Sequence, residues 1–495
     1  MTETLAPHHP TSVQTGVHAD ASSAGHKKSW AVLAVTLTAQ ILVVVDISVV
    51  NTALPTIGRS LQLDGGQLQW LVTAYLMMSG GGLLLGGRVA DLLSRRRVFL
   101  TGLALFTFAS LVSGFAGNAA ELIAARAVQG LSAALLTPSA LSLLMTTYEG
   151  EQRKKGLALW GAVGSLGVAV GVLVGGAITT WTSWQFIFWV NGPIGLVALL
   201  VGWSVLSKDV TVAPRKISQF DVPGAVTVIG GLAALICGLG GTAAHGWWSA
   251  PTLIALGASA VLLTAFIGLE ARTTQPLFPP HIWKLSALVS STAVMLGVTG
   301  LLVGTVFLTS IFMQTVLGFS ALDAGMAFLP FALAITVGAV VARHLMAHAS
   351  PRVVAALGLI LVTAAALLLS SASGDSHYAI GLLPGLVVLG LGVGMVFAPV
   401  SVTAMTGIPA SHAGVASGFL MTGHEVGAAL GVAVLSAVAS SAGNLTGTDG
   451  LEGVAAACSR GFVAAAGLAA CVAAVALWRM PSTRAEASAG MRMHH

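Results

Sequence analysis

Residues 30–53 read WAVLAVTLTAQILVVVDISVVNTA, an apolar stretch that is interrupted by a single carboxylate at Asp46. About 20 apolar residues in a helix cross the roughly 30 Å hydrocarbon core of a bilayer, so this stretch is long enough to span a membrane. Similar apolar blocks recur along the chain between short polar connections. The pattern predicts an all-α integral membrane protein.

The composition supports this class. Of 495 residues, 56% are hydrophobic and 8% are charged, whereas about 25% of an ordinary soluble domain is charged. The formal net charge of +5 does not indicate a nucleic-acid partner, because the basic residues mark one side of a membrane. Cys237, Cys458 and Cys471 lie far apart in apolar stretches. Their spacing indicates no metal site and no redox pair, so we expect no metal and no cofactor.

Fourteen transmembrane helices are predicted from the apolar runs and the breakers between them. They form a first group of six, then two further helices, then a second group of six. The predicted ranges are 30–53, 68–87, 98–117, 120–146, 156–180, 185–206, 222–243, 250–269, 287–316, 324–346, 352–372, 378–405, 412–441 and 455–478.

This grouping predicts two six-helix bundles, as in transporters that are built from parallel repeats with the substrate path between them. The expected parts are a disordered cytoplasmic tail (1–29), an N-terminal bundle (30–207), two extra helices with a linker (208–286), a C-terminal bundle (287–480) and a cytoplasmic tail (481–495). The first part lacks an apolar core and a cleavage site, so no removable signal peptide is expected.

The basic residues predict the orientation. With a cytoplasmic N-terminus, all but three of the 22 Lys and Arg residues fall on the inner side. Arg59 and Arg460 fall outside, and Arg126 lies within the fourth predicted helix. The positive-inside rule demands this bias. We therefore expect a multi-pass protein of the inner (plasma) membrane with both termini in the cytoplasm.

Asp46 and Arg126 are candidates for proton coupling. A charged side chain inside an apolar helix is costly and usually functional. At 1.5 Å per residue, the two side chains lie at similar depths in the membrane. They can therefore form an ion pair that depends on protonation and that couples charge to shape. The alternative is that Arg126 only ties helices together.

His424 and Glu425 lie near the middle of the thirteenth predicted helix, where either side chain facing lipid would be costly. We consider both as candidates for a substrate or proton site. Two interpretations stay open for Glu425, which are a site for a proton or a cationic substrate, and a buried structural pair. For His424, a structural role is the alternative.

The fifth and thirteenth predicted helices are rich in glycines at spacings of three or four, which stack on one helix face and let backbones approach closely. Close packing alone would explain them, and sliding faces during alternating access are the other interpretation. The glycines that form the signature in the fifth helix are Gly167, Gly171, Gly175 and Gly176.

Four motifs stand in order along the chain. They are DISVVNTALP at residues 46–55, GRVADLLSRRR at 87–97, RAVQG at 126–130 and GVAVGVLVGG at 167–176. Together they resemble the major facilitator superfamily, specifically its 14-helix drug:proton antiporters, over residues 30–478. Leu92 and Ser94 depart from the usual Arg and Gly of the second motif, and Val172 stands where the fourth usually has Pro.

The resemblance implies export of a hydrophobic or amphipathic small molecule, such as a drug, dye, antibiotic or secreted metabolite, by proton antiport. The second motif lies in the loop between the second and third predicted helices, and the resemblance implies that Asp91 latches the two halves. The latch residues are Gly87, Asp91, Arg95 and Arg96. We expect Asp91 to contact the helix N-terminus that Ser411 caps before His412. A solvated loop charge is the alternative.

The proton gradient is expected to be the energy source, since no Gly-rich loop ending in Lys-Ser or Lys-Thr is present to bind ATP. The expected partners are therefore protons, the small-molecule substrate and the lipid bilayer. Other functions are export of one specific endogenous metabolite, a lipid-modifying membrane enzyme, or a sensor that does not transport. The enzyme would need a cluster of polar catalytic groups, which the sequence does not show.

Overall fold

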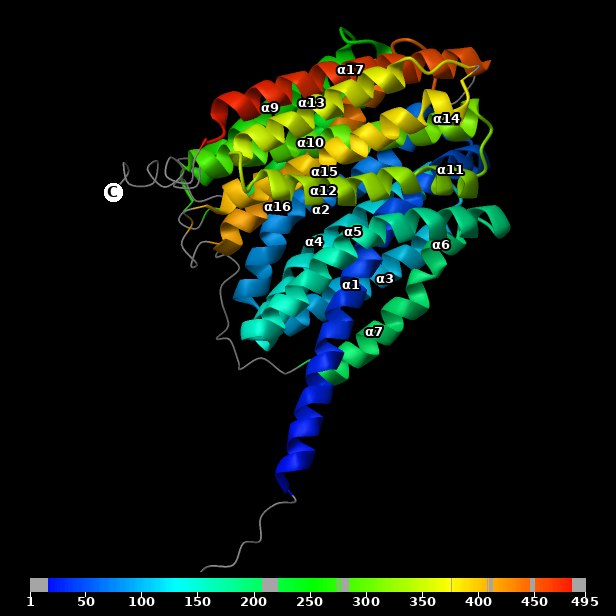
Figure 1. The fold of residues 1–495 in the computed structure, drawn as a ribbon. Coiled ribbons are helices and arrows are strands. Elements are labelled where there is room, and N and C mark those ends of the chain that lie inside the picture. Colours follow the sequence, from blue (N-terminus) through cyan, green and yellow to red (C-terminus); the bar gives the residue numbers. More distant parts are fainter. Residues whose placement is uncertain are drawn as a thin grey trace, which may run out of the picture.

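The computed structural model describes residues 17–206, 221–273, 276, 285–374, 376–406, 408, 413–445 and 450–482. Within these ranges the elements are all helical, and they run side by side as one elongated bundle (Figure 1). The predicted all-α membrane fold is confirmed.

The N-terminal set contains the first seven helices. Their bounds are α1 (Val17–Leu61), α2 (Gly65–Leu92), α3 (Arg95–Gly114), α4 (Ala119–Thr147), α5 (Gly150–Trp181), α6 (Phe186–Trp189) and α7 (Asn191–Val205). Two further helices follow, which are α8 (Val222–His245) and α9 (Ala250–Glu270). Polar side chains cap the N-termini of several of these helices. For example, Asp64 and Gln67 form a capping box at the start of α2, which satisfies donors that the helix itself leaves free.

The C-terminal set contains the remaining helices. Their bounds are α10 (Ser286–Ile311), the π-helix η3 (Phe312–Val316), α11 (Ala321–Ala327), α12 (Leu329–Leu345), α13 (Pro351–Ser370), α14 (Tyr378–Gly381), α15 (Leu383–Met405), α16 (Ala413–Ala439) and α17 (Gly450–Arg479). The breaks before α12 and α15 coincide with Pro330 and Pro384, each at the start of the following helix. Proline cannot donate a helical hydrogen bond, so it suits a first turn.

The two sets pair their helices in the same way. In the N-terminal set α1 packs on α5, α2 on α4 and α3 on α7. In the C-terminal set α10 packs on α16, α12 on α15 and α13 on α17. The sets meet through α2 and α16, α1 and α10, and α5 and α11, while α8 packs against both α2 and α16. This arrangement supports two repeated bundles with an added helix pair.

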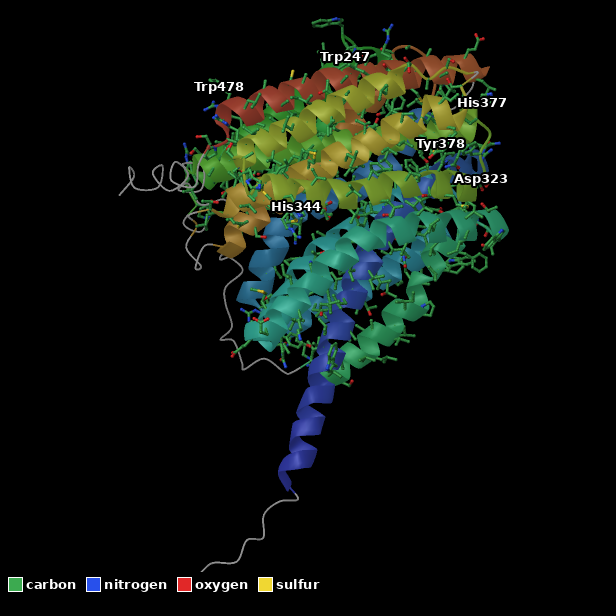
Figure 2. All side chains as sticks on the ribbon, in the orientation of Figure 1. Trp247, Asp323, His344, His377, Tyr378 and Trp478 are labelled. Carbon is green, nitrogen blue, oxygen red and sulfur yellow. The ribbon has the colours of Figure 1, made fainter. Side chains whose placement is uncertain are left out.

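Eleven helices in the described part are long and apolar enough to cross a membrane. The other three predicted spans coincide with α2, α5 and α8, of which α5 and α8 contain shorter apolar segments. The exact count of fourteen crossings stays a prediction. Figure 2 shows Trp478 near one end of the C-terminal set and Asp323, His377 and Tyr378 near the other.

Two predicted boundaries are wrong. Helix α1 begins at Val17, so residues 17–29 are not the disordered tail that the sequence predicts, although residues 1–16 lie outside the described part. The alanines of this segment favour extension of the helix beyond the bundle. Helix α2 continues to Leu92, so most of the run 87–97 lies on helices rather than in a loop. Hydropathy marks where the hydrocarbon ends, and a helix can continue beyond that point.

Candidate functional site

Asp46 is the centre of a buried polar cluster that four helices build. Asp46 lies on α1 and is 3% exposed. The carboxylate forms an ion pair with Arg126 of α4. It also accepts a hydrogen bond of 3.1 Å from Gln129 Nε2 of α4 and one of 3.3 Å from Asn191 Nδ2 of α7. Because the acceptor atoms are satisfied on several sides, the ionised carboxylate is tolerated away from water.

Arg126 is enclosed as completely as its partner. It is 2% exposed, and its Nε donates to the Leu71 carbonyl at 3.2 Å while Nη1 donates to Gln129 Oε1 at 3.1 Å. Its guanidinium carbon lies 4.4 Å from the centre of the Tyr75 ring, within range of a cation–π interaction. Leu71 and Tyr75 both belong to α2, so Arg126 connects α1, α2 and α4.

Further polar groups on α3 hold the amide side chains of Gln129 and Asn191 in place. Asn191 Nδ2 also donates to Ser110 Oγ at 3.0 Å, and Ser110 Oγ donates to the Phe188 carbonyl at 3.0 Å. Ser113 Oγ donates to Gln129 Oε1 at 3.3 Å. These contacts extend the cluster to α3 and fix the orientation of both amides. A change in the charge of Asp46 would therefore affect the contacts among α1, α2, α3, α4 and α7.

The glycine face of α5 fixes the position of α1 beside this cluster. A Cβ added to Gly171 would lie 2.7 Å from Ser48 Cβ, and one added to Gly175 would lie 2.8 Å from Val49 Cα. Gly167 would meet Val44 at 2.9 Å. All three α1 residues flank Asp46 in sequence, so the glycines let α5 press against the segment that carries the carboxylate. These contacts favour the close-packing interpretation.

Gly176 differs from the other signature glycines because it faces the C-terminal set. A Cβ there would lie 2.7 Å from the Ala321 carbonyl oxygen and 2.8 Å from Leu322 Cα, both on α11. Helix α5 is continuous past Val172, the position at which the resembled motif has proline. The carbonyl of Val172 lies 2.8 Å from a Cβ built on Gly325. Helices α5 and α11 therefore approach closely across the junction of the two sets.

His424 and Glu425 lie on α16, and Glu425 interacts electrostatically with Tyr75, whose ring lies against Arg126. His424 Nδ1 is 3.5 Å from Glu425 Oε1, and the two side chains are 34% and 17% exposed. The remaining carboxylate oxygen, Glu425 Oε2, is buried without a hydrogen-bond partner. A Cβ on Gly80 of α2 would lie 2.7 Å from Glu425 Cβ. Glu425 thus lies where the two bundles meet, with an open acceptor.

The predicted latch is only partly described. The side chain of Asp91, the surroundings of Gly87 and the backbone of residues 409–412 lie outside the described residues, so the contact between Asp91 and the start of α16 stays a prediction. Arg95 lies in the first turn of α3. Arg96 Nη2 donates to the Trp203 carbonyl at 2.6 Å and the guanidinium lies over that ring. Arg96 therefore ties α3 to α7 within one bundle.

Four hydrogen bonds join the two sets towards the end of the bundle where α1 ends and α11 begins. Ser310 Oγ donates to the Asn51 carbonyl at 3.1 Å, and Gln314 Nε2 donates to the Thr52 carbonyl at 2.9 Å. Ser436 Oγ donates to Gln69 Oε1 at 2.7 Å. The Leu322 amide donates to Thr180 Oγ1 at 3.0 Å. The bundle is therefore closed at this end.

The sequence identified the charged pair but missed several of its partners. None of the four sequence motifs includes Leu71, Tyr75 or Ser110. Tyr75 was detectable as a bulky polar side chain inside an apolar span, since the chain has only three tyrosines. Among the described residues, no group of three His, Cys, Asp or Glu side chains could hold a metal ion.

Comparison with known proteins places these features among membrane transporters. A sequence model of the family described as Major Facilitator Superfamily matches residues 36–432. The chain is 39% identical to the "Cephamycin export protein CmcT" of Amycolatopsis lactamdurans, covering 84% of this chain and 86% of the relative. It is 38% identical to the "Puromycin resistance protein pur8" of Streptomyces alboniger, covering 84% and 82%.

The fold is also similar to solved structures. A crystal structure of the peptide transporter POT in complex with sulfate superposes with a TM-score of 0.64 and 16% sequence identity, covering 91% of this chain and 94% of that one. At this identity the likeness concerns the fold alone.

Proposed function

The chain belongs to the major facilitator superfamily, and we propose that it exports hydrophobic or amphipathic small molecules across the plasma membrane in exchange for protons. The observation that supports this proposal most is the buried pair of Asp46 and Arg126. A pair of ionisable groups inside a membrane-spanning bundle is expensive, and in transporters such groups serve proton relays or substrate paths.

Antibiotics are the proposed substrate class. The two relatives are named for export of cephamycin and for resistance to puromycin. Both are similar to this chain over more than four fifths of its length. A second candidate is export of one specific endogenous metabolite, which would use the same site and would differ in a narrower substrate range. Neither of these two names supports a lipid-modifying enzyme or a sensor without transport.

Protonation of Asp46 is the proposed coupling step. A proton neutralises the carboxylate and leaves the guanidinium of Arg126 with only carbonyl acceptors and the Tyr75 ring. A buried charge that loses its partner is strongly destabilised. Helices α1, α2 and α4 then gain free energy by moving to an arrangement that solvates Arg126 differently. Substrate and proton thus favour different states of one equilibrium, as antiport requires.

For the transporter to open at its closed end, the contacts between the two sets at that end must break. All four hydrogen bonds at the closed end join neutral groups, and each bond contributes about 0.5–1.5 kcal/mol. They can therefore be exchanged for water as the bundles rotate. We propose that this end faces outward and that both termini are cytoplasmic, as the basic residues predict. Asp91 would latch the inner end in the alternate state.

Glu425 is the proposed second polar site on the substrate path. Its Oε2 atom, which has no hydrogen-bond partner, lies at the junction of α2 and α16, the helices through which the bundles meet. Glu425 Oε1 lies beside His424 Nδ1, but Oε2 has no partner and can accept a proton or bind a cationic substrate. His424 lies beside it and contacts the Phe397 ring at a centroid distance of 6.0 Å.

Everted membrane vesicles test the proposed function. Vesicles that contain the protein should accumulate antibiotics or dyes when a proton gradient is imposed, and an uncoupler should abolish the accumulation. Arg97→Gln, which removes a charge at an exposed position, provides a control variant. Accumulation that persists with an uncoupler and follows ATP instead would overturn proton antiport. A single accepted compound within a broad panel would favour the specific-metabolite alternative.

A further inference from the structure

Tyr75 lies between the two acidic sites of the protein, and its hydroxyl is unused in this state. The residue is 0% exposed, and within the described part of the chain its hydroxyl has no hydrogen-bond partner. A buried hydroxyl without a partner costs free energy, so its presence calls for an explanation. The ring already contacts Arg126, whose guanidinium carbon lies 4.4 Å from the ring centre, but a phenylalanine ring would provide that contact too. The hydroxyl therefore points to a second role.

Charged groups from three helices act on the Tyr75 hydroxyl. Asp46 of α1 and Arg126 of α4 belong to the buried cluster, whereas Glu425 belongs to α16 of the other set. His424 is the titratable neighbour of Glu425. The hydroxyl is therefore within electrostatic range of the carboxylates of both sites.

The other helices that pack against α2 add no further charge at this level. Apart from Cys237 of α8, which is exposed, the remaining titratable side chains that the structure describes on α1, α3, α4, α8 and α16 lie in first or last turns. The electrostatics around Tyr75 thus depend on the two acidic sites themselves.

Two glycine contacts hold α2 between the helices that carry these groups. A Cβ added to Gly130 of α4 would collide with the Tyr75 carbonyl oxygen, and one added to Gly80 of α2 would lie 2.7 Å from Glu425 Cβ. Larger side chains at the two glycines would force these helices apart. Gly130 ends the RAVQG motif at 126–130, so this motif supplies both the arginine and the close approach that places Tyr75 beside it. Helix α2 therefore connects the two acidic sites by direct packing.

Glu425 offers the acceptor that the Tyr75 hydroxyl lacks. Among the described residues, Glu425 Oε2 has no hydrogen-bond partner, while Oε1 lies 3.5 Å from His424 Nδ1. An unused donor and an unused acceptor thus belong to the two helices that form the junction, and the two groups interact electrostatically. A hydrogen bond between them would satisfy both. It would be strongest when Glu425 is ionised, because a charged acceptor strengthens a hydrogen bond.

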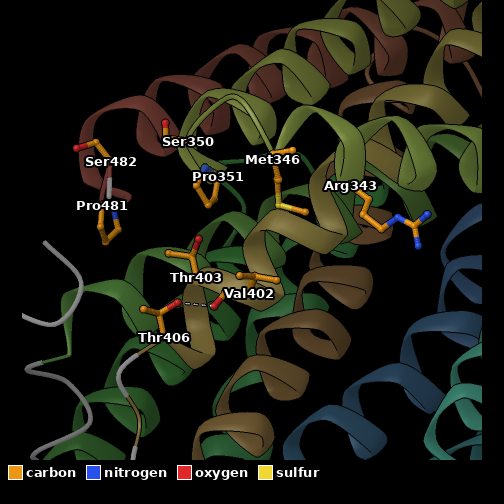
Figure 3. A pocket seen from close by; sticks show the side chains of 10 residues that line it. Arg343, Met346, Ser350, Pro351, Val402, Thr403, Thr406, Pro481 and Ser482 are labelled. Carbon is orange, nitrogen blue, oxygen red and sulfur yellow. Dashed lines mark hydrogen bonds between the residues drawn. The ribbon is translucent and has the colours of Figure 1, made fainter. Parts of the chain in front are cut away.

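The cavity that Figure 3 shows does not join the two sites. It has a volume of about 500 Å³ and lies in the C-terminal set, between the end of α12, the start of α13 and the last turns of α15. None of its lining residues belongs to α2 or α16. Because Tyr75 is also fully buried, a connection between the sites at this level has to run through side chains.

We propose that Tyr75 is a positioning residue that couples Glu425 to the pair of Asp46 and Arg126, by donating its hydroxyl to Glu425 Oε2 when Glu425 is ionised. This role rests on the proposed proton antiport. Formation of the bond draws the ring away from Arg126, which then depends more strongly on an ionised Asp46. When Glu425 takes up a proton, the bond weakens and the ring returns to the guanidinium, as in this structure. A change of charge in one bundle thereby alters the stability of the ion pair in the other.

An infrared pH titration of the purified full-length protein in lipid tests this proposal without a substrate. The carboxyl band of Glu425 is the pH-dependent band that Glu425→Gln removes. In Tyr75→Phe, Glu425 should bind its proton about tenfold more tightly than in the wild type, because the ionised carboxylate has lost a charge-assisted hydrogen bond. Asp46→Asn should change the midpoint of this band in the wild type, and it should change the midpoint less when combined with Tyr75→Phe.

Tyr378→Phe is the matched control, because the Tyr378 hydroxyl donates to the Ala327 carbonyl at 2.6 Å within the C-terminal set. It should lower the melting temperature and leave the midpoint of Glu425 unchanged. Tyr75→Phe should melt as the wild type does, since it keeps the ring beside Arg126 and removes a hydroxyl that has no partner in the described structure.

An unchanged midpoint of Glu425 in Tyr75→Phe would overturn the proposal, and so would an equal effect of Asp46→Asn with and without the Tyr75 hydroxyl. A titration without any band that Glu425→Gln removes would also overturn it, because Glu425 would then not change its charge. Export in everted vesicles is measured separately. Absence of uncoupler-sensitive export by the wild type would refute proton antiport itself, while the infrared titration would still decide whether Tyr75 couples the two sites.

Discussion

Removing one charge or both charges of the Asp46 cluster separates its structural role from its proposed role in transport. Asp46→Asn keeps the size of the side chain but leaves Arg126 buried without a counter-charge. Breaking a buried ion pair in this way costs about 3–5 kcal/mol, whereas replacing both partners by neutral groups is often nearly neutral. We expect the full cost of about 3–5 kcal/mol for Asp46→Asn, because both side chains are at least 97% buried.

The double variant Asp46→Asn/Arg126→Gln should therefore recover most of the stability that the single variant loses. Gln129 and Asn191 can still donate to the new amide oxygen at position 46, since both already contact that side chain. Transport should not recover, because no ionisable group remains in this cluster to carry the proton. We expect the single variant to insert in the membrane at reduced stability, and both variants to lack uncoupler-sensitive export.

Thermal unfolding in detergent and export in everted vesicles measure the two effects on the same preparations. Asp46→Glu is the control, since it keeps the ionisable group and should retain partial export. Restoration of export by the double variant would refute the reasoning, because the pair would then serve structure alone. Equal stability of the single and double variants would show that Arg126 does not depend on its counter-charge.

Three further predictions address the glycine face, the second polar site and the orientation. Gly171→Ala should destabilise the protein by about 1–3 kcal/mol, since the new Cβ would lie 2.7 Å from Ser48 Cβ, whereas Gly467→Ala, with no atom within 4 Å, should have no such effect in the same thermal assay. Glu425→Gln should reduce export of cationic dyes more than export of neutral ones, and an equal loss for both would contradict a cation site. A reporter fused after His495 should read cytoplasmic, and a periplasmic signal would reverse the proposed topology.

The helices were predictable because a membrane imposes strict rules on the sequence. Every apolar run of sufficient length became a helix, and the predicted range 98–117 differs from α3 by only a few residues. The run 87–97 was placed in a loop because the predicted spans end at residue 87 and resume at residue 98, whereas the chain continues as a helix to Leu92. The π-helix at Phe312–Val316 was also not predictable from the hydropathy of the sequence.

The candidate site was predictable only in its charged residues. Asp46 and Arg126 stand out because an apolar helix rarely carries a charge. Asn191 belongs to a different helix 145 positions away from Asp46, and only the packing of α7 beside α1 brings them together. Tyr75 likewise depends on the contact between α2 and α4. Long-range partners of this kind follow from the fold, which periodicity alone does not give.

Proton movement during transport tests the central claim most directly. Proteoliposomes with a pH-sensitive dye inside are supplied with an exported antibiotic on one side, so that the substrate gradient is the only driving force. The wild type should move protons in the direction opposite to the substrate, and Asp46→Asn should move none. Substrate movement by the wild type without proton movement, or wild-type proton movement by Asp46→Asn, would contradict the account.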